Sequence, residues 1–180
     1  MPFANFEYQA ALPPPALAEF VESFWRLANH SDAEQPVIIV PDGRVDVFFT
    51  HSATEPYHVL LLGLDTQPTA QVIAPQTRTF AISWKLLGAD YLLPVRLASL
   101  PQHACHLPPD YLGIRAADLL DFESFYTKAS ARIQQLLPSE IDNRKRKLFQ
   151  LIYTTSGTLT VEAYADAAAW SSRQINRYFQ

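Results

Sequence analysis

Residues 160–180 read TVEAYADAAAWSSRQINRYFQ and predict two short helices joined by a tight turn. Thr160 is a suitable N-cap for the first helix, because its hydroxyl can accept a hydrogen bond from a free backbone N–H. Ser171 restarts the chain, and Gln174 follows three residues later, which completes a capping box. The stretch has the pattern of a helix-turn-helix, an arrangement that places its second helix in the major groove of DNA.

The second of these helices separates apolar from polar side chains. Ile175 and Phe179 are four residues apart, so we expect both to turn inward. The side chains expected to face DNA are Arg173, Gln174, Asn176 and Arg177. Arginine can bond guanine through two hydrogen bonds, and asparagine or glutamine can bond adenine in the same way. The alternative interpretation is an ordinary helical hairpin that completes a globular core.

These residues resemble the first helix-turn-helix of the AraC-type transcription regulators of bacteria. The matching positions are Val161, Ala165, Ser171, Ile175, Asn176, Arg177, Tyr178 and Phe179. The resemblance implies that Arg173, Asn176 and Arg177 face the bases. It also implies a second helix-turn-helix beyond Gln180, so that the chain would stop partway through its DNA-binding domain. The family usually has glycine where Ala169 stands, so we expect either a different backbone angle or strain in this turn.

Three segments of the body resemble a sensor domain found in one subgroup of the same regulators. They are FVESFW at 20–25, VPDGRVDVFF at 40–49 and FAISWKLLGADYLL at 80–93. The resemblance implies a body that senses a small effector, forms a homodimer, or does both. Large flat side chains suit an effector pocket, and the candidates are Trp25, Trp84 and Tyr91. As aromatic residues on strands and helices, they could instead belong to the core.

Composition divides the chain into two parts. None of the 14 prolines follows Pro138, and proline disfavours helix interiors, so the body should be rich in turns and the tail helical. Residues 1–140 hold 8 basic and 15 acidic side chains, whereas residues 141–180 hold 6 and 3. A weakly basic tail on an acidic body is consistent with a nucleic-acid module. We therefore predict a sensor or dimerisation domain over 1–137 and the start of a DNA-binding domain over 138–180.

Hydrophobic periodicity indicates an α+β fold, with antiparallel strands first and helices after them. The predicted strands cover 37–40, 45–50, 59–62, 70–74 and 79–85. The first two are expected to form a hairpin, the last to be half-buried, and a barrel-like arrangement is one form that the strands could take. The predicted helical segments cover 17–24, 88–93, 122–137 after an N-cap at Asp121, and 141–155.

Three further features each have two interpretations. The helix over 121–137, counted from its N-cap, is the candidate dimer seam, by analogy with related regulators. The basic run at 144–147 could contact phosphate, but such a run more often forms the solvated face of a helix. Asp42, Arg44 and Asp46 could line a ligand site, although local turn chemistry is the simpler interpretation.

The sequence contains no recognisable catalytic or cofactor motif. The group His103, Cys105, His106 and Asp110 is too closely spaced for a zinc site without a second, distant pair. A Cys105 nucleophile with His103 or His106 as base would lack an orienting partner. The five glycines form no phosphate-binding pattern. We therefore expect no enzymatic activity, no metal and no cofactor.

Two functions follow from these observations. The first is a cytoplasmic, sequence-specific DNA-binding transcription regulator whose body senses a small molecule, forms a homodimer, or both. The second is an isolated small-molecule-binding sensor domain with no DNA binding of its own. A single cysteine, no secretion-signal pattern and no long apolar stretch favour the cytoplasm and no membrane contact. A second motif of the same kind downstream of Gln180 would favour the regulator.

Overall fold

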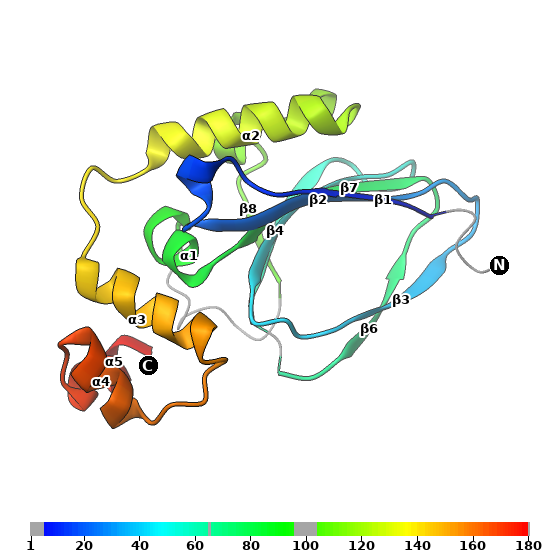
Figure 1. Cartoon of the computed structure of the whole chain (residues 1–180). Helices are drawn as coiled ribbons and strands as arrows, with labels where there is room; N and C mark the ends of the chain where they lie inside the picture. The colour runs from blue at the N-terminus through cyan, green and yellow to red at the C-terminus, as the bar shows by residue number, and fades with distance from the viewer. Residues whose placement is uncertain (1–5, 65, 96–103, 180) are drawn as a thin grey trace.

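The computed structural model describes residues 6–64, 66–95 and 104–179, and these form a mixed α+β fold (Figure 1). In these ranges, the strands form a main antiparallel sheet of order β1-β2-β7-β4-β5-β8 and a separate two-stranded sheet, β3-β6. The strands are β1 Phe6–Ala11, β2 Val21–Asn29, β3 Gln35–Ile39, β4 Val45–His51, β5 His58–Leu62, β6 Thr69–Ile73, β7 Thr77–Trp84 and β8 Cys105–Leu107. The α-helices are α1 Leu86–Leu92, α2 Phe122–Leu136, α3 Asn143–Thr154, α4 Val161–Ala168 and α5 Ser172–Phe179.

One face of the main sheet forms the core, and α2 lies across it (Figure 1). Neighbouring strands place a row of fully buried side chains on this face, namely Phe24, Ile82, Val47 and Leu61. The ring of Phe125 on α2 lies 5.2–6.4 Å, between centroids, from the rings of Phe24, Phe49 and Phe80. The apolar side of α2 is therefore used within its own chain, and the dimer seam at this helix stays a prediction.

The helix predicted over 17–24 is wrong. A single 3-10 turn covers Pro15–Leu17, and the chain then enters β2 at Val21. Strand β2 pairs with β1 along one edge and with β7 along the other. Hydrogen bonds to these distant segments override the local helical pattern.

The hairpin predicted over 37–50 is also wrong, although both strands and the turn between them exist. Strand β3 pairs with β6, whereas β4 pairs with β5 and β7 in the main sheet. The turn has the expected local chemistry, because Gly43 has a φ of 75° and the Asp42 carboxylate accepts a hydrogen bond from the Arg44 amide at 2.9 Å. The described strands form no closed barrel, since β1 and β8 are the two edges of the main sheet.

Strand β7 is buried on both sides near its end, which corrects the half-buried strand predicted there. Residues 80–84 are all buried. Ala81 faces away from α2, and its register partners are Trp25 on β2 and Phe48 on β4. The rings of Trp25 and Phe48 meet with centroids 5.1 Å apart, so the two large neighbours cover the small side chain between them.

The predicted helices at 122–137 and 141–155 are confirmed to within two residues at each end. The carboxylates of Asp121 and Asp142 cap them by accepting backbone hydrogen bonds from Ser124 and Arg144. Helices α3, α4 and α5 gather at one end of the molecule (Figure 1). Within the described ranges, no helix has the length and apolar character needed to cross a lipid bilayer. The domain boundary at residue 137 stays a prediction.

Candidate nucleic-acid interface

Helix α4 begins at the cap that the sequence predicts. The Thr160 hydroxyl accepts a hydrogen bond from the Ala163 amide at 3.2 Å. The inner side of the helix consists of Tyr164, Ala165 and Ala168, all buried. These three form one cluster with Leu148 of α3 and Ile175 of α5. The small alanines allow α5 to cross close to α4.

Ala169 ends α4 in the left-handed conformation, with φ 54° and ψ 43°. The Trp170 amide donates to the carbonyl of Ala165 at 2.9 Å, which closes the helix end. The turn thus keeps the backbone angle that favours glycine and accepts the strain of a Cβ atom. The Trp170 ring is half-buried and packs edge-to-face on Tyr178, with centroids 5.5 Å apart.

Helix α5 begins with the predicted capping box. The Ser171 amide donates to Oε1 of Gln174 at 2.8 Å, and the Gln174 amide donates to the Ser171 hydroxyl at 3.2 Å. The side-chain oxygen of Gln174 is therefore used to hold the helix start. This leaves the NH₂ group of Gln174 as the part of that side chain best placed to contact a base.

Helix α5 turns its polar side chains to solvent. All four residues predicted to face DNA are exposed, namely Arg173, Gln174, Asn176 and Arg177. Ile175 is buried, with 4% of its surface exposed, as predicted. Residues 172–179 include no acidic side chain that would repel phosphate. The contact of these four residues with DNA stays a prediction.

The inward orientation predicted for Phe179 is wrong. Its side chain is 46% exposed, and its ring meets those of Phe149 and Tyr178 edge-to-face, with centroids 6.4 Å and 5.1 Å apart. Tyr178 is half-buried instead and packs against the core of the body. Helix α5 contacts α3 and α1 as well as α4, and Tyr178 makes the contacts with α3 and α1. Because each residue of a helix points about 100° away from the previous one, turning Tyr178 inward turns Phe179 toward solvent.

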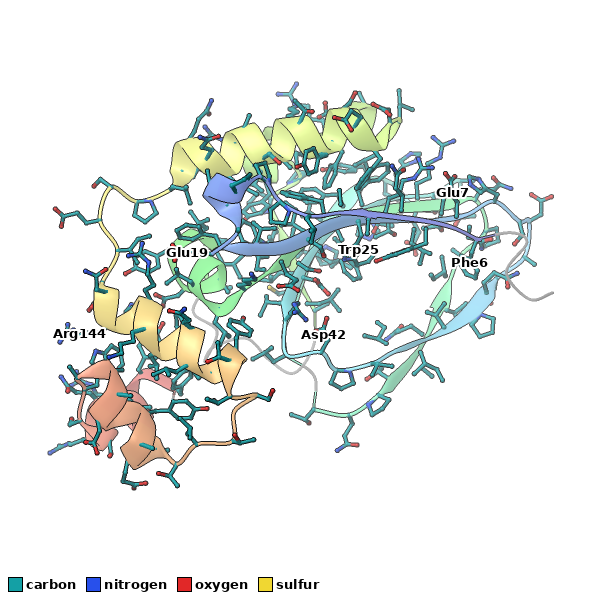
Figure 2. The ribbon with its side chains drawn as sticks, viewed as in Figure 1. Phe6, Glu7, Glu19, Trp25, Asp42 and Arg144 are labelled. Carbon is teal, nitrogen blue, oxygen red and sulfur yellow. The ribbon has the colours of Figure 1, made fainter. Side chains whose placement is uncertain are left out.

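The basic run at 144–147 makes ion pairs within the chain, which neither sequence interpretation anticipated. Arg144 pairs at 2.8 Å with Asp142, the N-cap of its own helix. Lys145 pairs with Asp90 at 2.8 Å, and Arg146 pairs with Glu19 at 3.2 Å. Two of these partners belong to the body, so the run attaches α3 to it. Arg144 and Glu19 are labelled in Figure 2.

The structure does not gather the three aromatic residues predicted to line an effector pocket. Trp84 belongs to the core and is 1% exposed. Tyr91 lies on α1, where its hydroxyl accepts a hydrogen bond from the Asp142 amide at 3.0 Å. Trp25 alone lies on the face of the main sheet that is turned away from α2 (Figure 2).

Trp25 begins a short polar chain that sequence reasoning missed. Its indole N–H donates to the Ser83 hydroxyl at 3.0 Å, and Ser83 donates to the Asp46 carboxylate at 2.5 Å. Burial raises the pKa of Asp46 to about 6, although the Ser83 hydrogen bond acts in the opposite direction. The only signal in the sequence is an aspartate placed between apolar strand residues in VDVFF.

Arg44 lines a cleft of about 410 Å³ between the body and α3, and Asp42 pairs with Arg44 at 3.7 Å. The charges of both residues also act on the Asp46 carboxyl. Glu22 pairs with Arg44 at 2.7 Å and with Lys85 at 3.5 Å, so the charges here satisfy one another. The described residues contain no metal-binding group of three or more acidic, histidine or cysteine side chains. His103, predicted as a weak ligand or base candidate, lies outside the described residues.

One protein-family comparison gave a match. The sequence model of a family described as Domain of unknown function (DUF6597) matches residues 9–106. This segment contains most of the main sheet and all of β3, β6 and α1, and it ends before α2. No curated protein and no solved structure matches the chain.

Proposed function

The chain belongs to the DUF6597 family, and we propose that this domain is the body of an AraC-type transcription regulator, with α4 and α5 as the helix-turn-helix that binds DNA. The proposal rests on one observation above all. Helix α5 buries Ile175 and at the same time exposes Arg173, Asn176 and Arg177. These side-chain types are the ones that read guanine and adenine in the major groove.

Selection from a random duplex library tests this function directly. Duplexes enriched by the 180-residue chain are measured by fluorescence anisotropy at several salt concentrations. We expect affinity to fall as salt rises, because bound cations are released from the phosphates. Arg173→Ala or Arg177→Ala should each weaken binding by about 1–3 kcal/mol if the side chain reads a base.

Arg132→Ala is the matched control, because Arg132 is an exposed arginine on α2, a helix that packs on the main core and not in the cluster of α3, α4 and α5. Its affinity for the selected duplex should equal that of the wild type. Enrichment of no duplex, or equal weakening by all three variants, would contradict the regulator. That outcome would favour an isolated sensor domain.

Small-molecule sensing is the second proposed activity, and the chain Trp25–Ser83–Asp46 supports it. An aromatic face beside a partly buried carboxylate offers both stacking and hydrogen bonding to a small ligand. A thermal-shift screen with metabolites should find ligands that raise the unfolding temperature of the wild type and of Asp118→Asn, but not that of Asp46→Asn.

Homodimerisation is part of the proposal too. Sedimentation equilibrium measures the mass of the particle in solution and so tests it.

A further inference from the structure

Helix α1 of the body is joined to the helical tail by four hydrogen bonds. Each links residues between 51 and 88 positions apart. The Leu86 amide donates to the Tyr153 hydroxyl at 2.8 Å, and the Asp142 amide donates to the Tyr91 hydroxyl at 3.0 Å. The Lys145 ammonium donates to Oδ2 of Asp90 at 2.8 Å, and the Tyr178 hydroxyl donates to Oδ1 of Asp90. One seven-residue helix therefore contacts both ends of α3 and the second half of α5.

Asp90 is the centre of this contact. One carboxylate oxygen binds Lys145 and the other accepts the hydroxyl hydrogen of Tyr178. The ammonium of Lys145 also lies 5.2 Å from the ring centre of Tyr91 and 4.9 Å from that of Tyr178. The side chains of Asp90 and Lys145 are only 19% and 25% exposed, so these contacts are less screened by water than surface pairs are.

Tyr178 is suited to donate in this cluster. Burial raises the pKa of its hydroxyl, and the bond to Asp90 raises it further, so the phenol keeps its proton. Tyr178 follows Arg177 directly on α5. Fixing the direction of one side chain fixes the rotation of the whole short helix about its axis, because each residue is offset from the next by about 100°.

Helix α1 is itself held firmly on the sheet. Only Lys85 separates it from β7, and the Lys85 amide donates to the carbonyl of Phe20 at 2.9 Å. Gly88 lies so close to the same carbonyl that a Cβ atom there would stand 2.1 Å from the oxygen. A helix packed this tightly offers a fixed point to which α5 can be attached.

We propose that Asp90 is a positioning residue, which clamps α5 to the body and keeps Arg173, Asn176 and Arg177 turned to solvent. The effect on DNA binding rests on the proposed function, whereas the clamp itself does not. Through this clamp, the body sets the orientation of the helix that reads DNA.

Hydrogen exchange measured by mass spectrometry tests the clamp without DNA. In Asp90→Ala, and in Tyr178→Phe, amides of α5 should exchange at least about fivefold faster than in the wild type, while those of α2 and the main sheet stay unchanged. Asp118→Asn is the matched control, because Asp118 binds Lys128 at 2.6 Å within the body and contacts no residue of α5. Unchanged exchange in α5 would overturn the proposal. If Asp90→Ala does not fold, Tyr178→Phe alone decides.

Affinity for the selected duplex tests the consequence. Asp90→Ala should weaken binding at least about fivefold, although removing a negative charge would by itself strengthen attraction to phosphate. Tyr178→Phe should weaken binding in the wild type but not in the Asp90→Ala background. Equal affinity of Asp90→Ala and wild type would overturn the positioning role and leave the proposed function intact. If α5 exchanges faster in the variants but the wild type selects no duplex, the clamp stands and the proposed function is rejected.

Discussion

At the scale of single residues, Asp46 shows how strongly its environment changes a side chain. A carboxyl group in water is ionised above its ordinary pKa of 3.8, but burial raises the pKa of Asp46 to about 6. The folded protein thus binds a proton in a pH range where the unfolded chain has released it. Because of that proton, the contribution of Asp46 to stability is fully present below pH 3.8 and is lost as the pH rises through about 6.

We predict that Asp46→Asn becomes more stable relative to the wild type as the pH rises from 4.5 to 7.5 (~3 pH units across the raised pKa). Asparagine stays neutral and can still accept the Ser83 hydrogen bond, so it avoids the cost of a buried charge. Urea unfolding of both proteins at the two pH values measures the difference. Other carboxylates, such as Asp142, titrate alike in both proteins, so their contributions cancel in the difference between the two free energies of unfolding. A difference in stability that is the same at both pH values would refute this prediction.

At the scale of elements, the pair α4 and α5 depends on a turn with one strained residue. Ala169 has a positive φ of 54°, which costs an L-residue with a Cβ atom more than it costs glycine. The rest of the unit is regular. Both helices have side-chain caps, and Ile175 fills the cluster between them and α3.

Ala169→Gly should stabilise the helical tail by roughly 0.5–1 kcal/mol, because relief of the left-handed strain exceeds the extra freedom of glycine in the unfolded chain. Urea unfolding followed by the helix signal of circular dichroism measures it. Ala167→Gly, two residues earlier in α4, is the control and should destabilise by a similar amount, since a regular helix favours alanine. If Ala169→Gly destabilises the protein as Ala167→Gly does, the turn is not strained.

At the scale of the whole molecule, α3 belongs to two hydrophobic clusters at once. Leu148 is fully buried in the cluster with α4 and α5, and the next residue, Phe149, is 3% exposed in the main core. Adjacent side chains on a helix point in different directions, so one helix can connect the two. The attachment of the tail to the body therefore combines apolar contacts with the ion pairs of Lys145 and Arg146 and with the hydrogen bonds to α1.

Calorimetry should separate the roles of these two neighbours. Phe149→Ala should lower the unfolding temperature of the body, with a loss of about 3–5 kcal/mol for a buried phenylalanine. Leu148→Ala should melt α4 and α5 at a lower temperature and leave the main transition where it is. The exposed neighbour Lys147 gives the control Lys147→Ala, with a change under about 0.5 kcal/mol. Identical single transitions for Leu148→Ala and Phe149→Ala would contradict the two-cluster arrangement.

The α-helices of the described residues could be predicted from the sequence alone, as could the turn at 41–44, although the helix also predicted over 17–24 does not form. Their signals are local, because a cap joins residues three positions apart, as Asp121 and Ser124 or Ser171 and Gln174 do. The exposed face of α5 follows from the same periodicity. Local patterns also place the strands β3 to β7 near their observed positions.

Only the tertiary structure decided which strands pair, and which side chains meet. The segment 17–24 becomes part of a strand, and β3 pairs with β6 instead of β4, because backbone hydrogen bonds to distant segments determine both. Ser83 lies 58 residues from Trp25 and 37 from Asp46, and Tyr178 lies 88 residues from Asp90. Partners so far apart leave no periodic mark in the chain, and the burial that strengthens their contacts exists only after the sheet and helices have packed together.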